Sequence, residues 1–200
     1  MRQQWKLAVG LGGVMIALGI AGAFYFFLPR TSQQPTVAGE SLFQLNLRFQ
    51  NQHGQSITLA DLKGKTVIMA MAYTGCQYTC PLILQKMKDI EAELAKRRYS
   101  RPVRFVLVSL DTDYDTPAVL AAFANTHALP APAWQLWHTD EETVSMLAAI
   151  LGVRYRQNGP RDFDHNILIA VLNKNGILVH SFTDLNESAD TMVATLKPLI

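Results

Sequence analysis

The chain has 200 residues, 49% of them hydrophobic and 17% charged, which excludes a mainly disordered protein and supplies a core for one domain of good size. Its formal net charge is +2, but Arg2, Lys6 and Arg30 all precede the first acidic residue, so the remainder is close to neutral. A neutral domain gives no electrostatic reason to expect nucleic acid as a partner.

An uncharged, apolar stretch begins at Leu7 and ends at Leu28. At about 1.5 Å per residue, a helix of this length reaches about 33 Å, enough to cross the ~30 Å hydrocarbon layer of a membrane. Arg2 and Lys6 on its N-terminal side favour a cytoplasmic N-terminus and an exported remainder. A cleaved signal peptide is the alternative, because residues 21–23 are small, but the aromatic run that follows favours a retained anchor.

We therefore expect residues 1–28 to form a cytoplasmic stub and a single transmembrane helix. Residues 29–41 are polar and contain two prolines, so we expect a flexible tether there. The folded domain is expected over residues 42–200.

The first part of this domain predicts an edge hairpin and two central strands. Apolar and polar residues alternate over 42–50, and a turn and a short strand over 56–59 follow. Residues 66–73 and 103–110 are apolar almost throughout, as expected of strands covered on both faces.

A helix is predicted between these strands, from Pro81, a favoured residue for the first turn, to about Arg98. Its apolar stripe comprises Leu82, Ile83, Met87, Ile90 and Leu94.

The later elements are, in order, a helix capped by Thr116 with Pro117 in its first turn, a strand over 134–138, a helix over 141–153, a strand pair over 166–173 and 176–182, and a closing helix over 188–200. The polar residues 155–164 are predicted as a loop. This order indicates an α/β fold, a thioredoxin-like central sheet flanked by helices with an N-terminal β-hairpin. The cysteines then lie where the first central strand leads into its helix.

Cys76 and Cys80 are the two cysteines of the chain, four positions apart and followed by Pro81. A structural disulfide is disfavoured, because closing so small a ring contributes only about 2 kcal/mol in the chain-entropy model. A redox pair is compatible with a helix N-terminus, which lowers thiol pKa values, although the usual redox spacing has two intervening residues. A metal site is the third interpretation, since soft sulfur ligands select Cu(I), zinc or iron–sulfur clusters.

Structural zinc normally takes four ligands, whereas Cu(I) accepts two or three, so a histidine would complete a copper site. His165 is the strongest candidate, because it follows a polar loop and precedes an apolar strand. The alternative is a loop histidine bonded to a backbone carbonyl. The other histidines have less favourable positions: His53, His127, His138 and His180.

The motifs "YTGCQYTCP", "SLDTDYDTP" and Asp164-His165 together resemble the Sco/SenC family of copper-binding, thioredoxin-like proteins that assist assembly of the copper centre of cytochrome oxidase. The resemblance covers about residues 42–200. It implies that Cys76, Cys80 and His165 bind copper, as Cu(I) and also Cu(II), and that the cysteines cycle between dithiol and disulfide. The chain departs from the family at three positions, where members commonly carry Pro-Asp and a small hydroxyl residue: Gln77, Tyr78 and Asn166.

The resemblance implies a metallochaperone at the bacterial inner membrane, with its domain in the periplasm. The expected partners are the copper subunit of a respiratory oxidase or another copper enzyme, other periplasmic copper chaperones, and thioredoxin-like reductants. The competing function is a thiol-disulfide oxidoreductase that keeps the cysteines of an oxidase subunit reduced, with Cys76 and Cys80 as its redox-active pair. A scaffold that only recruits partners is a third hypothesis.

Three acidic residues near these motifs are candidates for supporting the site. Asp111 and Asp115 lie in a segment that resembles the start of a calcium loop, but the required glycine and glutamate are missing, so calcium is rejected. We expect a loop that caps the next helix, or, by the family resemblance, carboxylates that orient the site. Asp164 is a candidate to hold the His165 ring through its second nitrogen. Met69 and Met71 are expected in the core.

Overall fold

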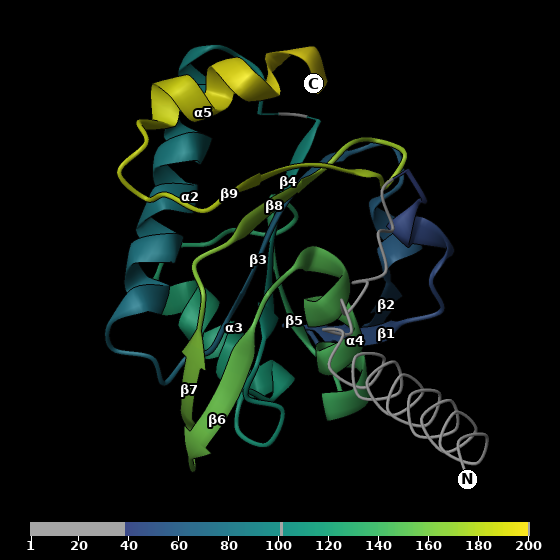
Figure 1. Ribbon diagram of the computed structural model, residues 1–200, viewed down its shortest axis with the longest axis vertical. Coiled ribbons are helices and arrows are strands. Elements are labelled where there is room, and N and C mark those ends of the chain that lie inside the picture. Colours follow the sequence, from purple (N-terminus) through teal and green to yellow (C-terminus); the bar gives the residue numbers. More distant parts are fainter. Residues whose placement is uncertain (1–38, 101, 200) are drawn as a thin grey trace, which may run out of the picture. The chain divides into compact units, whose positions relative to one another are not determined.

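The structure is a computed structural model that describes residues 39–100 and 102–199 (Figure 1). The predicted anchor over residues 1–28 and most of the predicted tether lie outside the described residues. Within the described part of the chain, no helix is long and apolar enough to span a bilayer. The membrane anchor therefore stays a prediction from the sequence.

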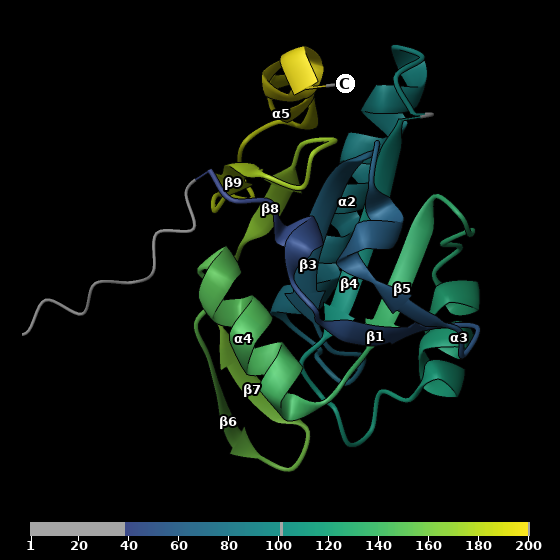
Figure 2. The ribbon, with the colours of Figure 1, turned by 90° about the vertical axis from the view of Figure 1, so that its right-hand side faces the viewer.

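A sheet of seven strands in the order β2-β1-β5-β4-β3-β8-β9 forms the centre of the domain. Its strands are β1 (Arg48–Asn51), β2 (Ser56–Thr58), β3 (Thr66–Ala72), β4 (Val103–Ser109), β5 (Trp134–His138), β8 (Ile169–Leu172) and β9 (Leu178–Phe182). The three middle strands β3, β4 and β5 pair in parallel, and the strands added at either side pair antiparallel (Figure 2). The strand β3, which leads to the cysteines, is thus fixed between two neighbours.

Helices cover both faces of this sheet, as Figure 1 shows for α2 and α4. One face packs against α2 (Thr79–Lys96), α3 (Pro117–Thr126) and α5 (Ala189–Leu196), and the other against α4 (Glu141–Leu151) and the short turns η1 (Leu42–Gln44) and η2 (Leu59–Leu62). Alternate residues of β3 point into the hydrophobic cores on the two faces of the sheet. Met69 and Met71 are buried on the α4 face, and Ile68 and Ala70 on the α2 face. The predicted α/β, thioredoxin-like architecture and the core placement of both methionines are confirmed.

The predicted N-terminal hairpin exists as β1 and β2, but its first strand is shorter than the alternation suggested. Residues Leu42–Gln44 form a 3-10 turn whose cap is the side chain of Ser41. The backbone N–H of Leu42 donates to the carbonyl of Gly176 at 2.8 Å, so this segment is tied to the β8–β9 turn and not to a neighbouring strand.

The helix after β3 begins earlier than predicted. It starts at Thr79, so Pro81 occupies the first turn, where its missing N–H costs nothing. Leu82 was predicted to face the core but is 59% exposed, and Leu84 is buried in its place. Cys80 therefore lies inside the first turn of α2.

The predicted loop over residues 155–164 is wrong. The structure has a separate two-stranded sheet there, β6 (Tyr155–Gly159) and β7 (Asp162–His165), visible as an isolated hairpin in Figure 1. Its turn consists of Pro160 and Arg161, a proline followed by a residue with positive φ, as type II turns have. Because the residues of β6 are mostly polar, the hydrophobic pattern did not predict this hairpin.

The helix α4 begins after Asp140, whose carboxylate accepts a hydrogen bond from the backbone N–H of Thr143 at 2.8 Å. This bond lowers the pKa of Asp140. A carboxyl with a lowered native pKa stabilises the fold above its unfolded pKa of about 3.9, and the stabilisation is lost as pH falls through the native value.

We expect Asp140→Ala to lower the free energy of unfolding by about 1 kcal/mol at pH 7, and by less near pH 3, because the cap is lost. Asp140→Asn is the matched control, since asparagine caps as well as aspartate but carries no titrating charge. Urea unfolding at both pH values measures the effect. Equal stability of Asp140→Ala and wild type at pH 7 would contradict it.

Candidate metal centre

The two cysteines lie at the junction between β3 and α2. The buried strand ends at Ala72, a short loop carries Cys76, and Cys80 follows in the first helical turn. The Sγ atom of Cys76 accepts a hydrogen bond from the backbone N–H of Cys80 at 3.4 Å. Both thiols are free, as a metal site or a reduced redox pair requires.

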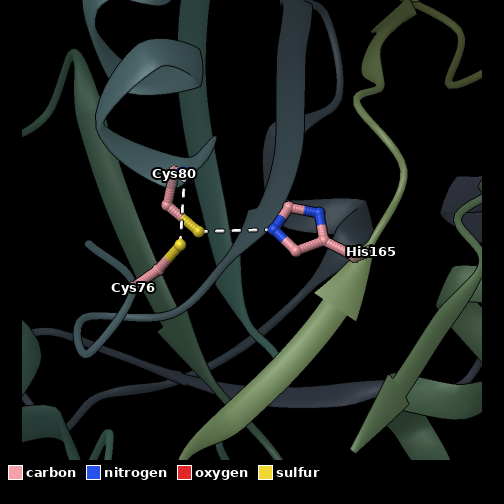
Figure 3. A group of neighbouring side chains, drawn as sticks. All are labelled: Cys76, Cys80 and His165. Carbon is pink, nitrogen blue, oxygen red and sulfur yellow. Dashed lines mark hydrogen bonds between the residues drawn. The ribbon is translucent and has the colours of Figure 1, made fainter. Parts of the chain in front are cut away.

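His165, at the end of β7, brings a nitrogen to the same point (Figure 3). Its Nε2 atom lies 3.3 Å from the Sγ of Cys80. The ligating atoms of Cys76, Cys80 and His165 all lie within 4.8 Å of one another. Across residues 39–100 and 102–199, no other three cysteine, histidine or acidic side chains meet in this way, and the other four histidines are outside this cluster.

Tyr73, directly after β3, holds the strand that carries His165. Its hydroxyl oxygen lies 3.3 Å from the backbone nitrogen of Phe163 and 3.4 Å from the carbonyl oxygen of Phe163. The two rings pack edge to face with centroids 5.1 Å apart. Because Phe163 is two residues before His165 on β7, these contacts fix the strand beside the cysteines. The sequence pattern around Tyr73 did not predict this role.

The second ring nitrogen of His165 has a partner that differs from the prediction. Its Nδ1 lies 3.1 Å from the carbonyl oxygen of Asn166, whereas Asp164 pairs with Arg156 at 3.2 Å on the surface. A carbonyl only accepts, so Nδ1 carries the proton, and Nε2 presents its lone pair to the sulfurs. Burial lowers the pKa of His165, and it outweighs the Asn166 carbonyl and the charge of Asp164, which both raise that pKa. The lowered pKa favours the neutral ring that a metal ligand needs.

Asn166 also joins the hairpin to the rest of the domain. Its side-chain oxygen accepts from the backbone N–H of Arg154 at 2.6 Å, and its amide nitrogen lies 3.4 Å from the carbonyl of Gly152. These bonds close the base of the hairpin beside the end of α4. One of the three departures from the family pattern is thus a structural residue of the hairpin.

The two thiols differ in their electrostatics. Burial raises the pKa of the Cys76 thiol, but the backbone N–H groups of Cys80, Tyr78 and Thr79 outweigh burial, and the net pKa is lowered. Burial raises the pKa of Cys80 strongly, and the neighbouring Cys76 adds to it. The helix N-terminus therefore acts on Cys76, which lies in front of it, and not on Cys80, which lies within it.

Of the predicted acidic residues, Asp115 supports the loop before the cysteines. Asp115 is fully buried and accepts hydrogen bonds from the backbone N–H of Thr74 at 2.9 Å, from the Thr74 hydroxyl, and from the Ser109 hydroxyl at 2.6 Å. Asp111 is also buried, and its Oδ1 accepts from the N–H of Tyr114 at 3.2 Å. The cap of α3 is Thr116, as predicted, so Asp115 is free to hold the cysteine loop.

A groove of about 640 Å³ opens beside Cys76 and His165. Its wall includes Tyr78, whose side chain is 83% exposed, and residues of the β6–β7 hairpin. The groove gives another molecule access to Cys76 and His165 from one side, whereas the buried Cys80 does not line it. It is formed by the two segments that also supply the ligands.

The family model described as SCO1/SenC matches residues 35–200. The chain belongs to the SCO1/SenC family. This confirms the resemblance that the cysteine, aspartate and histidine motifs indicated.

Known relatives agree with this assignment. The SCO1 protein homolog of Bacillus subtilis is 31% identical over 86 residues, covering 43% of this chain and 44% of that protein. The SCO2-like protein of Rickettsia felis is 26% identical over 117 residues, 55% of this chain and 56% of that protein. The chain thus spans about half the length of these curated relatives. Bradyrhizobium japonicum ScoI, solved with copper bound, has a TM-score of 0.65 and 23% identity over 77% of this chain and 97% of that one, and this likeness supports the fold.

The thiol electrostatics predict selective alkylation. In the reduced chain at pH 7, we expect iodoacetamide to modify Cys76 more than about tenfold faster than Cys80, because the thiolate is the nucleophile. Tandem mass spectrometry of timed digests locates the label. Equal rates in the folded chain would contradict the assignment, and a denatured sample, in which both rates should converge, is the control.

The buried carboxylate predicts a stability effect. We expect Asp115→Asn to lower the free energy of unfolding by about 2 kcal/mol, because an amide cannot accept from all three donors at once. Urea denaturation measures the change. Asp113→Asn, two residues away and exposed, is the matched control and should change stability by less than about 0.5 kcal/mol.

Proposed function

We propose that the chain is a copper-binding assembly factor that delivers copper to the copper centre of a respiratory oxidase. The observation that carries the proposal is the convergence of two thiols and one neutral imidazole within 4.8 Å, on segments 85 residues apart in sequence. In this function copper is the ion that is delivered, and its ligands are Cys76, Cys80 and His165.

The donor set supports copper over other metals. Two thiolates and one imidazole form a soft set with three members, which suits Cu(I) and leaves a structural zinc site one ligand short. The lowered pKa of Cys76 favours its thiolate, and metal binding must displace the proton of the buried Cys80. The groove beside the ligands offers a route for ligand exchange with the thiolates of a partner.

The oxidase as destination is supported by family membership. One solved relative, BsSco, is described as a member of the Sco family of cytochrome c oxidase assembly proteins; it has a TM-score of 0.66 and 21% identity over 75% of this chain and 88% of that one. Residues 1–28 would anchor the domain in the inner membrane of a bacterium, with the N-terminus in the cytoplasm and the domain in the periplasm. Anchoring would keep the domain close to membrane-bound oxidase subunits.

The difference between the two thiols favours a second function, thiol-disulfide exchange. The thiolate of Cys76 would attack a disulfide in the partner and form a mixed disulfide while releasing one partner thiolate. Cys80 would then attack Cys76, giving the Cys76–Cys80 disulfide and a fully reduced partner. A dithiol reductant of the thioredoxin class would supply the electrons that restore the pair. His165 is not needed as a ligand in this cycle.

An anaerobic Cu(I) titration of the full chain in detergent, against a chromophoric Cu(I) chelator, separates the two functions. We expect one tightly bound ion per chain, loss of tight binding in Cys76→Ser and Cys80→Ser, and at least about tenfold weaker binding in His165→Ala, because one of three ligands is removed. The exposed His53→Ala is the matched control and should bind as wild type does. Equal Cu(I) affinity of wild type and His165→Ala would overturn copper delivery in favour of thiol exchange.

A further inference from the structure

Arg161 occupies an unusual backbone position in the hairpin that carries His165. It is the second residue of the β6–β7 turn and has a φ of 60°. Glycine and asparagine are the usual residues at such a position, since a side chain there is sterically disfavoured. The contacts of the Arg161 side chain stabilise the residue in this backbone conformation.

The guanidinium of Arg161 reaches two residues of the β4–α3 loop. Its central carbon lies 3.3 Å from the centroid of the Tyr114 ring, and its Nε lies 3.7 Å from Oδ2 of Asp111. The Asp111 side chain is only 4% exposed, and this Oδ2 atom has no hydrogen-bond partner in the described part of the chain. A buried carboxylate oxygen without a hydrogen bond is costly, and the nearby positive charge offsets part of that cost.

The same guanidinium lies against the cysteine loop. A Cβ atom added at Gly75 would lie 3.1 Å from Nη2 of Arg161, closer than most side-chain contacts allow. Gly75 directly precedes Cys76. Arg161 therefore joins three segments: the hairpin of His165, the loop of Asp111, and the loop of Cys76.

The hairpin needs such a contact because it is not part of the seven-stranded sheet. Tyr73 holds the middle of β7 through Phe163, and Asn166 closes the base of the hairpin. The turn at its far end is held by Arg161. His165 ends the strand that follows this turn, four residues after Arg161, so tilting of the hairpin would move the imidazole relative to the sulfurs.

We propose that Arg161 is a positioning residue, which latches the β6–β7 hairpin onto the loops of Asp111 and Gly75 and thereby holds His165 in reach of Cys76 and Cys80. The inference rests on the proposed function for its copper readout. Arginine suits this task because its planar group stacks on the Tyr114 ring while its Nε edge faces the carboxylate. An arginine side chain offers only hydrogen-bond donors, so Arg161 is not itself a ligand.

Cu(I) competition titrations of the full chain test the latch. We expect Arg161→Ala to bind Cu(I) about tenfold more weakly than wild type, which is the usual scale for residues that orient metal ligands, and Arg161→Lys to lose less. Arg48→Ala is the matched control, because Arg48 is an exposed arginine of β1 that does not line the groove beside the ligands. It should bind within about twofold of wild type.

A double-mutant cycle tells positioning from general damage. If Arg161 acts through the imidazole, adding Arg161→Ala to His165→Ala should weaken Cu(I) binding by less than about twofold further. Wild-type affinity in Arg161→Ala, or a full tenfold loss on the His165→Ala background, would overturn the proposal.

Hydrogen exchange of the metal-free chain gives a readout that does not involve copper. We expect the amides of residues 155–165 to exchange at least about tenfold faster in Arg161→Ala than in wild type, with β3 and β4 unchanged. Unchanged exchange in the hairpin would overturn the latch. If wild type bound no copper while the hairpin still opened in Arg161→Ala, the proposed function would fail and the latch itself would be supported.

Discussion

The candidate site depends on one contact, the 3.3 Å approach of the His165 imidazole to the Cys80 sulfur, between residues 85 positions apart. The cysteines come from a junction whose strand is paired on both sides in the main sheet. The histidine comes from a two-stranded hairpin outside that sheet. The donor set thus combines a rigid junction, which carries the cysteines, with a separate hairpin, which carries the histidine. The contacts between the junction and the hairpin determine its geometry.

In the proposed function the site accepts and releases a copper ion, so the mobility of its two parts matters. Buried strands open at high free energy, whereas exposed polar hairpins with few buried contacts open at low free energy. Of the residues in β6, none is buried, and in β7 Phe163 alone is buried. We therefore expect ligand exchange to proceed by movement of the histidine arm, while the thiols keep their positions at the start of α2.

Two buried carboxylates support the site, Asp115 within the junction that carries the cysteines and Asp111 toward the hairpin. Asp115 binds the loop before Cys76 through two hydrogen bonds from Thr74 and binds β4 through a third from Ser109, and Asp111 presents an otherwise unpaired oxygen to the Arg161 charge. Burial raises the pKa of Asp111, and the hydrogen bond from Tyr114 and the charge of Arg161 oppose that rise. Buried polar groups of this kind are tolerated where they fix a functional geometry, and the sequence motif that contains them is explained by that role.

Sequence alone determined the elements with a strong local signal. The apolar runs of β3, β4 and β8, the Thr116 cap and the i, i+4 cysteines follow from periodicity and residue chemistry, and they sufficed to predict the fold. The choice of Cys76, Cys80 and His165 as copper ligands came from the family resemblance of the motifs. The β6–β7 hairpin, the Asn166 partner of His165, and the roles of Tyr73 and Arg161 were decided by tertiary structure. Each of these depends on contacts between residues far apart in the chain, or on polar residues without a hydrophobic pattern, and local propensity carries no information about either.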